Sequence, residues 1–270
     1  MKNVLVDMEP SPKELTRLRA IAGIEVRLVD PENRPRPLPS DLIRDIHILL
    51  CTFPPTNFAE MKSLELIQLA SAGYGQLYGL PMAELGVRAC NGRGIFDVAI
   101  AEWNIAMMVN LARNLRTMIR NQEAGVWDRS PIFQREIRGL VAGIWGYGGI
   151  GRETARLAKA LGLTVQVMSR TGVRPSKNVY HVPGTGDPEG RFPDRVYVTG
   201  QETEFLAGLD FLILSLPLTK STEGIVGERE LQILPRSAFV LNPARGPLIK
   251  EQALLAALRE GWIAGAALDT

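Results

Sequence analysis

Short apolar runs alternate with helical patterns along most of the chain. In the first ninety residues, several apolar runs have the length of buried strands: 3–7, 24–29, 46–50, 66–70 and 87–90. From residue 140 onward further runs of this kind follow: 141–145, 164–168, 195–198, 211–216, 238–241 and 263–268. Helical patterns lie between them, and the clearest cover 151–161 and 250–260. Such alternation predicts an α/β fold with parallel sheets covered by helices.

The residues after the first apolar run mark the start of a helix. Ser11 is a cap residue, Pro12 suits the first helical position, and Glu14 stands three residues after the cap. The sequence therefore predicts that a helix begins at Pro12.

A long helical pattern from Val98 to Gly125 separates the two series. Its apolar residues form two stripes on different faces, one made of Val98, Ala101, Ile105, Met108, Ala112, Leu115 and Ile119 and one made of Ile100, Trp103, Met107 and Leu111. A helix that is apolar on two faces must be covered on both. The pattern therefore predicts either a helix buried in one core or a helix shared between domains or subunits. The second interpretation favours a homodimer.

Length and composition restrict the class of protein. A chain of 270 residues most naturally forms two domains, and its 46% hydrophobic and 22% charged residues exclude a disordered chain. The 31 Lys and Arg residues nearly balance the 29 Asp and Glu residues, so a net charge of +2 provides no field of one sign for nucleic acid or an anionic membrane. No apolar run reaches the length of a membrane span, and the N-terminus lacks the apolar core of a signal peptide. Because Cys51 and Cys90 form no CxxC pair, we expect a reducing, cytoplasmic location and no metal.

A glycine-rich motif, Gly146-Tyr147-Gly148-Gly149-Ile150-Gly151, follows the predicted strand 141–145 and opens the next predicted helix. Gly146 permits a tight turn, Gly148 lets a pyrophosphate approach the backbone, and Gly151 lets helix and strand pack closely. The free N–H groups and the positive end of the helix can then hold the phosphates. In this strand–turn–helix context the motif predicts a dinucleotide site rather than a plain glycine-rich turn.

The end of the next predicted strand indicates which dinucleotide binds. An acidic side chain there would accept hydrogen bonds from the adenosine ribose and repel a 2′-phosphate. The chain has Ser169, Arg170 and Thr171 instead. Two hydroxyls and a guanidinium can hold a 2′-phosphate, so we expect NADP(H) to be preferred, with NAD(H) as the other candidate. The alternative is a solvated Arg170 that stacks on the adenine.

A third motif, Asn242-Pro243-Ala244-Arg245-Gly246, follows the predicted strand 238–241. Side chains at the carboxyl end of such a strand face the binding crevice of a parallel sheet. An arginine there can bind a carboxylate with two hydrogen bonds and polarise a neighbouring carbonyl. By position alone, a structural salt bridge of Arg245 is an equal alternative.

Together these motifs resemble the D-isomer-specific 2-hydroxyacid dehydrogenase family, and its glyoxylate and hydroxypyruvate reductases in particular. The resemblance rests on four ordered motifs: Gly146–Gly151, Leu216-Pro217-Leu218-Thr219 with Thr222, Asn242–Gly246, and Gly265-Ala266-Ala267-Leu268-Asp269. The family's linking helix is resembled by three shorter segments: Ala99–Glu102, Leu111–Arg113 and Gly125–Trp127. Spacing and order match from about residue 64 to the chain end, whereas the first sixty residues match only in their β-α pattern.

The resemblance implies two open parallel-sheet domains. Residues 1–97 would form a flavodoxin-like substrate-binding domain, and residues 98–270 a Rossmann NAD(P)-binding domain inserted into it. The active site would lie in the cleft between the domains. The resemblance also implies a homodimer formed through the helix 98–125.

The reaction implied by the resemblance is reduction of a small 2-keto acid to a D-2-hydroxy acid. Arg245 would bind the substrate carboxylate and carbonyl. The backbone amides of Ala72, Gly73 and Tyr74 would bind the carboxylate as well, and a turn of small residues directly after a strand does let backbone approach a ligand. Further cofactor contacts would come from Leu216, Pro217, Thr222, Ala244 and Asp269.

The family's catalysis also needs a histidine as acid–base and a glutamate that steers it, both downstream of the position matched by Asp269. Histidine suits this role because it gains and loses a proton near neutral pH. The 270 residues end at Thr270, directly after an apolar strand, so we expect them to be a truncation of a longer protein. Of the two histidines present, His47 is expected to be structural and His181 to lie at the surface or on the phosphate side.

The segment 172–200 is a second departure, because the family connects these two strands more briefly. It is rich in glycine and proline, and we expect a disordered surface insertion. The alternative is that Arg174 and Lys177 reach a 2′-phosphate.

Two other functions are open on the same scaffold. Some relatives of this fold act as nucleotide-sensing corepressors, and absence of a catalytic histidine from the full-length gene would favour that function. Others are dehydrogenases of an inorganic or one-carbon acid, and substrate profiling would distinguish such an enzyme from a 2-keto acid reductase.

Overall fold

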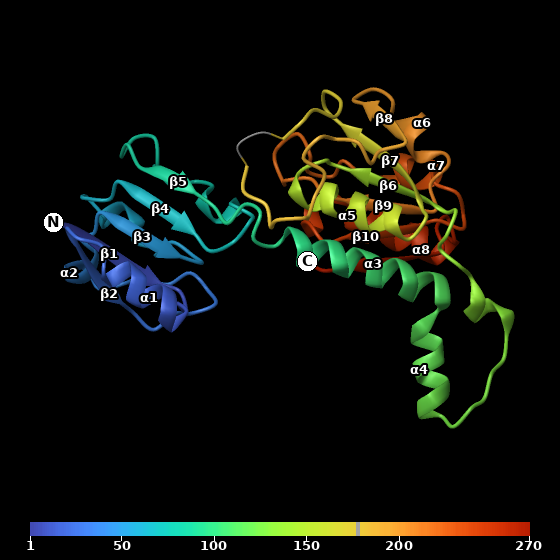
Figure 1. Ribbon diagram of the computed structural model, residues 1–270, viewed down its shortest axis with the longest axis horizontal. Helices are drawn as coiled ribbons and strands as arrows, with labels where there is room; N and C mark the ends of the chain where they lie inside the picture. Colours follow the sequence, from blue (N-terminus) through green and yellow to red (C-terminus); the bar gives the residue numbers. More distant parts are fainter. Residues whose placement is uncertain (177–178) are drawn as a thin grey trace. The chain divides into compact units, whose positions relative to one another are not determined.

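The chain divides into two compact units, Met1–Arg93 and Gly94–Thr270 (Figure 1). The computed structural model describes every residue except 177 and 178, so Lys177 lies outside the described residues. The domain boundary expected after residue 97 lies four residues beyond the division between the units. Each unit contains one parallel sheet of its own.

The first unit is built on a five-stranded parallel sheet in the order β2-β1-β3-β4-β5. Its strands are β1 (Lys2–Asp7), β2 (Ile24–Leu28), β3 (Ile48–Cys51), β4 (Leu66–Leu69) and β5 (Arg88–Cys90). Its α-helices are α1 (Pro12–Arg19) and α2 (Ser40–Ile43). The first helix starts at Pro12 as predicted, although Ser11 makes no side-chain cap. The strand order is that of a flavodoxin-like sheet.

Apolar strand residues supply the core of the first unit. Leu5, Leu49 and Ile67 are fully buried in neighbouring strands, and they pack with Phe58 and Met61 from the connection between β3 and β4. The central strands β1, β3 and β4 carry this core and read as short apolar runs, which is why the sequence pattern located them.

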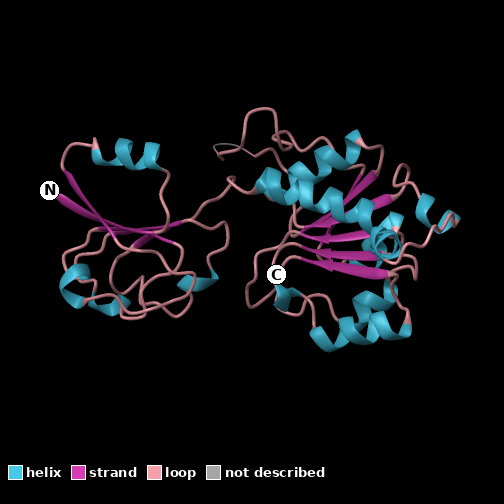
Figure 2. Cartoon of the chain, turned by 90° about the horizontal axis from the view of Figure 1, so that it is seen from below, coloured by secondary structure: helices cyan, strands magenta, loops and turns pink. Residues whose placement is uncertain are grey.

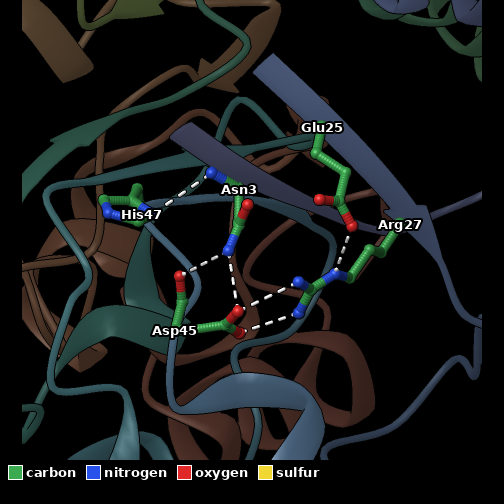
Figure 3. Close-up of polar contacts among 5 residues, drawn as sticks. All are labelled: Asn3, Glu25, Arg27, Asp45 and His47. Atoms are coloured by element: carbon green, nitrogen blue, oxygen red, sulfur yellow. Dashed lines mark hydrogen bonds and ion pairs between the residues drawn. The ribbon is translucent and has the colours of Figure 1, made fainter. Parts of the chain in front are cut away.

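A polar cluster explains the position of His47. Arg27 of β2 donates hydrogen bonds of 2.7 and 2.9 Å to Asp45, and this ion pair holds the pKa of Asp45 below its ordinary value (Figure 3). The Asn3 side chain donates to Asp45 at 2.7 Å, and the Asn3 amide donates to Nδ1 of His47 at 3.1 Å. Since Nδ1 accepts, the ring proton lies on Nε2. His47 thus orders the backbone between β1 and β3, which is a structural role.

The second unit is built on a six-stranded parallel sheet in the order β11-β10-β9-β6-β7-β8. Its strands are β6 (Val141–Trp145), β7 (Thr164–Ser169), β8 (Arg195–Val198), β9 (Phe211–Leu214), β10 (Phe239–Asn242) and β11 (Gly265–Leu268). From β6 the chain adds β7 and β8 on one side, and it then adds β9, β10 and β11 on the other side, so the order of the strands reverses between β6 and β9. This is the doubly wound order of a dinucleotide-binding fold, in which ligands bind beside the reversal at the carboxyl ends of the strands.

Helices cover both faces of the six-stranded sheet (Figure 2). On one face, α3 (Asp97–Arg113) and α5 (Gly149–Ala160) bury Met108 and Ala155 against the strands. The other face carries α6 (Glu202–Leu206), α7 (Glu228–Ile233) and α8 (Glu251–Glu260), which bury Phe205, Leu231 and Leu254. The predicted fold class, two open parallel sheets with helices, is confirmed.

The single helix expected over 98–125 is wrong in one respect. Asn114 takes a left-handed conformation with φ of 49°, and it separates α3 from α4 (Leu115–Glu123). Asparagine tolerates this conformation better than other residues with a side chain. The break therefore needs no glycine or proline, and the apolar pattern of the sequence runs through it without a visible interruption. The part buried in the unit is therefore α3 alone, whereas α4 has no buried residue and extends away from the sheet (Figure 1).

Within the part of the chain that the structure describes, none of the helices combines the length and the apolar character that crossing a membrane requires.

Candidate active site

The glycine-rich loop connects β6 to α5 in a shape that only glycine permits at two positions. Gly146 has φ of 103°, and a Cβ built on it would lie 2.5 Å from the carbonyl oxygen of Ser215. A Cβ on Gly151 would overlap the carbonyl oxygen of Gly146. The loop therefore lies directly against the end of β9, and the helix directly against the loop. The roles predicted for the two glycines in the turn and in close packing match this geometry.

Gly148 has a different environment. It lies directly before α5 with φ of −80°, and a Cβ built on it would meet no atom within 4 Å. Gly148 is the N-cap residue of α5 and has no side chain with which to cap the helix. Gly148 is exposed, so its backbone is open to a ligand directly before the helix, where the helix dipole favours an anion. The loop fits the pyrophosphate of a dinucleotide.

A carboxylate that the sequence did not single out lies beside this loop. Asp97, the first residue of α3, is nearly buried, and its carboxylate occupies the space where a Cβ of Gly149 would stand. Acidic residues are common in the first turn of a helix because they suit its dipole, so nothing in the sequence pointed to a second contact. The fixed place of Asp97 explains why position 149 is glycine.

The side chains of the two residues directly after β7 are exposed to solvent. Ser169 donates its hydroxyl proton to the carbonyl oxygen of Gly172 at 2.8 Å. Arg170 and Thr171 are exposed, and Arg170 forms no ion pair with any residue that the structure describes. A solvated guanidinium at this strand end is available to a ligand.

Asn242 fixes the turn that carries Arg245. The Asn242 side chain is buried, and its Oδ1 accepts from the amides of Ala244 at 3.1 Å and Arg245 at 3.2 Å. Its Nδ2 donates to the carbonyl oxygen of Arg245 at 2.9 Å. Arg245 is exposed, and its guanidinium donates to the Ala244 carbonyl oxygen at 2.6 Å without an ion pair to a described residue. The alternative of a structural salt bridge finds no partner among the described residues.

The other positions expected to contact a cofactor lie along the same edge of the sheet. Leu216 and Pro217 follow β9, and Thr222 closes their turn by donating to the Pro217 carbonyl oxygen at 2.6 Å. Asp269 follows β11, and its amide donates to the Asn242 carbonyl oxygen at 3.1 Å. The carboxyl edge of the second sheet therefore gathers the glycine-rich loop, the Ser169 segment and the Arg245 turn.

The first unit presents its own candidate, the turn after β4. The amides of Ala72, Gly73 and Tyr74 donate to no described acceptor. The turn itself is held by Asn91, which donates to the Ala72 carbonyl oxygen at 2.6 Å, and by Ser71, which donates to that of Gly73 at 2.7 Å. Consecutive free amides in a fixed turn form a site suited to an anion.

The expected disordered insertion over 172–200 is wrong for the described residues. Asp187 within it is 3% exposed and accepts a hydrogen bond from the Tyr147 hydroxyl at 2.6 Å. The predicted strand 195–198 is present as β8. Sequence reasoning missed Asp187 because its partner lies forty residues away in the glycine-rich loop. His181 is exposed, and its Nδ1 lies 3.2 Å from the Val179 carbonyl oxygen.

No group of three or more His, Cys, Asp or Glu side chains that could hold a metal ion occurs among the residues that the structure describes.

A comparison with protein families identifies this arrangement. The model for the NAD binding domain of the D-isomer specific 2-hydroxyacid dehydrogenases matches residues 105–270. The chain belongs to this family. The resemblance expected from the motifs is thereby confirmed, as is the assignment to a family of NAD-binding oxidoreductases.

Relatives within the D-isomer specific 2-hydroxyacid dehydrogenase family extend the match. The 4-methyl-2-oxopentanoate reductase A of Aspergillus oryzae is 35% identical over 208 residues, which are 77% of this chain and 58% of that protein. A glyoxylate reductase of Thermococcus gammatolerans is 29% identical over 252 residues, with coverage of 88% and 71%. The crystal structure of a glyoxylate reductase from Paecilomyes thermophila matches with a TM-score of 0.80 at 25% identity, and covers 99% of this chain and 81% of that one. The chain thus spans 58% to 81% of the length of these three proteins.

Proposed function

We propose that the protein reduces a small 2-keto acid of the glyoxylate or hydroxypyruvate type to a D-2-hydroxy acid, with NADPH as the preferred reductant. The observation that carries the proposal is Arg245, a solvated guanidinium on a turn fixed by Asn242, on the same sheet edge as the exposed backbone of Gly148. The names of the relatives, reductases of glyoxylate and of 4-methyl-2-oxopentanoate, support the same reaction type.

The residues of this chain account for binding and polarisation of the substrate. The nicotinamide, when bound, supplies the hydride. Arg245 donates two parallel hydrogen bonds to the substrate, which orient its carboxylate and draw electron density from the keto oxygen. The first unit serves as the substrate-binding domain, where the free amides after β4 are suited to a carboxylate. A proton must also reach the forming alkoxide, and neither His47, held by Asn3, nor the exposed His181 is assigned that task.

The test is a binding titration followed by an assay. Purified protein is titrated with NADPH and NADH by fluorescence, and the loss of NADPH absorbance is then followed with glyoxylate, hydroxypyruvate and 4-methyl-2-oxopentanoate. Binding with turnover supports the reductase. Binding without turnover of any 2-keto acid would favour the nucleotide-sensing alternative, and failure to bind either nucleotide would remove the proposal.

Replacing Arg170 by Asp is expected to raise the Kd for NADPH at least about tenfold more than the Kd for NADH. A charge-assisted contact to a phosphate is lost and a like charge takes its place, while NADH carries no 2′-phosphate. Fluorescence titration of both nucleotides measures the ratio. Arg259→Asp is the matched control, because it makes the same change of charge at an exposed arginine in the last turn of α8 and should change neither Kd. Equal losses for NADPH and NADH in the Arg170 variant would contradict the phosphate assignment and leave adenine stacking.

We also propose a homodimer, now assigned to α4 and the loop that follows it. Apolar side chains there are largely exposed: Met118 at 40%, Ile119 at 54%, Val126 at 54%, Trp127 at 88% and Ile132 at 57%. Large exposed apolar side chains gathered in one segment often mark an interface, and a second copy of the chain would cover them.

The state of the cysteines bears on where the protein works. The two cysteines, Cys51 buried and Cys90 exposed, are both unpaired, which supports a cytoplasmic location.

The dimer predicts the behaviour of an Ile119→Asp variant. A carboxylate in the interface should dissociate the dimer at micromolar concentration, because burying an unpaired charge outweighs the apolar contact it replaces. Light scattering with size-exclusion chromatography measures the mass. The exposed Ile21 in the first unit provides a matched control, since Ile21→Asp adds the same charge outside α4. A wild-type protein that runs as a monomer would contradict the proposal.

A further inference from the structure

A buried carboxylate ties the crossover between β7 and β8 to the glycine-rich loop. We call residues 172–176 and 179–192 the strap. Asp187 of the strap is 3% exposed, and one of its carboxylate oxygens accepts from the Tyr147 hydroxyl at 2.6 Å. The same carboxylate accepts from the amides of Arg191 at 2.8 Å and Phe192 at 3.0 Å. Asp187 thus joins its own turn to the second residue of the loop.

Arg152, in the first turn of α5, strengthens this connection. Its guanidinium lies over the Tyr147 ring, 4.8 Å from the ring centroid. It also donates to the backbone carbonyl oxygens of Asp187 and of Arg174, the latter at 2.6 Å. One side chain therefore holds two points of the strap, before and after the residues outside the described part of the chain.

Glu153 provides a second anchor one residue further along α5. It is 1% exposed, and its carboxylate accepts from the Gly186 amide of the strap and from the Arg156 guanidinium. Val173 and Phe192, at the two ends of the strap, pack with Tyr147 against the apolar core on this face of the sheet. The strap is therefore bonded to the first turns of α5 at Arg174, Gly186 and Asp187, and its two ends pack on the core.

Charge and burial give the Tyr147–Asp187 contact a fixed polarity. Burial acts to raise the pKa of Asp187, but the hydrogen bonds from Tyr147 and from the amides of Phe192 and Arg191, with the charge of Arg152, outweigh it and hold that pKa below its ordinary value. Burial and the Asp187 carboxylate raise the pKa of Tyr147. At neutral pH the phenol is therefore the donor and the carboxylate the acceptor.

We propose that the strap is a positioning element for the dinucleotide, with Asp187 and Tyr147 as its positioning residues. The inference rests on the proposed function. Tyr147 stands between Gly146 and Gly148, whose own backbones have little conformational preference. The side-chain contact to Asp187 then fixes the peptides that face the phosphates before the ligand arrives. Ordering the loop in advance lowers the entropy lost on binding.

Two variants test the strap by acting on this contact from either side: Asp187→Asn replaces one carboxylate oxygen by an amide, and Tyr147→Phe removes the donor. Asp187→Asn and Tyr147→Phe are each expected to raise the Kd for NADPH and for NADH about tenfold, by the same factor for both because the two share the pyrophosphate. The KM for the nucleotide should rise while kcat stays near that of the wild type, since neither residue is assigned a contact with the reacting carbon. The double variant should be no weaker than the single ones, because both remove the same contact.

Asp194→Asn is the matched control. Asp194 lies in the same crossover and also bonds to α5, because it accepts from Lys159 of that helix at 2.8 Å, and it accepts from the Val165 amide of β7 at 2.8 Å. Its partner Lys159 is in the last turn of that helix, far along the chain from the glycine-rich loop. The Asp194 variant should lower the melting temperature and leave both Kd values unchanged.

The outcomes separate this inference from the proposed function. If the wild type binds neither nucleotide, the proposed function fails. If the wild type binds while Asp187→Asn and Tyr147→Phe bind equally well and melt lower, the strap is only structural and the inference is overturned. If Asp187→Asn does not fold, Tyr147→Phe decides alone, because it removes one oxygen atom and keeps the packing of the ring.

Discussion

Replacing Arg245 by Lys is expected to lower kcat/KM for a 2-keto acid by about 10²- to 10³-fold. The guanidinium can donate two parallel hydrogen bonds in one plane, and an ammonium group cannot. Arg245 sits on a turn whose backbone is fixed by three hydrogen bonds to Asn242, so the shorter reach of a lysine is not made up by movement of the turn. Steady-state kinetics with glyoxylate measures the effect.

The binding of nucleotide provides the internal check for this variant. The Kd for NADPH should change little, because Arg245 is assigned to the substrate. Arg259→Lys, an exposed arginine in the last turn of α8, should behave as the wild type in both measurements. Near-normal kinetics of Arg245→Lys would show that Arg245 has a structural role only.

Two alanine substitutions in the glycine-rich loop are expected to act on different properties, one on stability and the other on nucleotide binding. Gly146→Ala should destabilise the second unit by about 2–4 kcal/mol, the sum of a left-handed conformation and an overpacked contact. The contact is with the carbonyl oxygen of Ser215, which belongs to the backbone and cannot rotate away. Gly148→Ala should leave the stability unchanged, since φ is −80° and no atom lies within 4 Å of the new Cβ.

Gly148→Ala should instead raise the Kd for either nucleotide by at least about tenfold, because a methyl group stands where the pyrophosphate approaches the backbone. Thermal unfolding and fluorescence titration of the same two samples give both quantities. If the Gly148→Ala protein binds NADPH as tightly as the wild type, the pyrophosphate does not bind at this loop. An unchanged melting temperature for Gly146→Ala would show that the loop relaxes at little cost.

The sheets could be predicted from the sequence because their central strands are largely buried. Strands such as β6 and β9 consist of consecutive apolar residues, and their ends fall within two residues of the predicted ones. The helix break at Asn114 could not be predicted, since asparagine tolerates the left-handed conformation and the apolar stripe continues beyond it. Local pattern thus located the elements, whereas single-residue conformations depended on their surroundings.

The candidate site was predictable where its residues are contiguous. The glycine-rich loop and the Arg245 turn each carry their signal within a short run of consecutive residues. The contacts of Asp97 with Gly149 and of Asp187 with Tyr147 join residues that lie far apart in the sequence, and nothing in either segment announces the other. Burial of a carboxylate is a property of the folded unit, so sequence reasoning took the segment around Asp187 for a disordered insertion.

The crossover from β7 to β8 has a consequence for how such a protein can change through evolution. Parallel strands are usually joined by a helix that packs on the sheet, so altering the helix disturbs the core. Here the described part of the crossover contains no helix, and of its residues Val173 and Phe192 are the apolar ones that pack on the core cluster. Lengthening a surface loop carries a loop-closure cost that grows only slowly with length. Mutation can therefore lengthen, shorten or recharge the exposed parts of the segment beside the glycine-rich loop while the six strands keep their register.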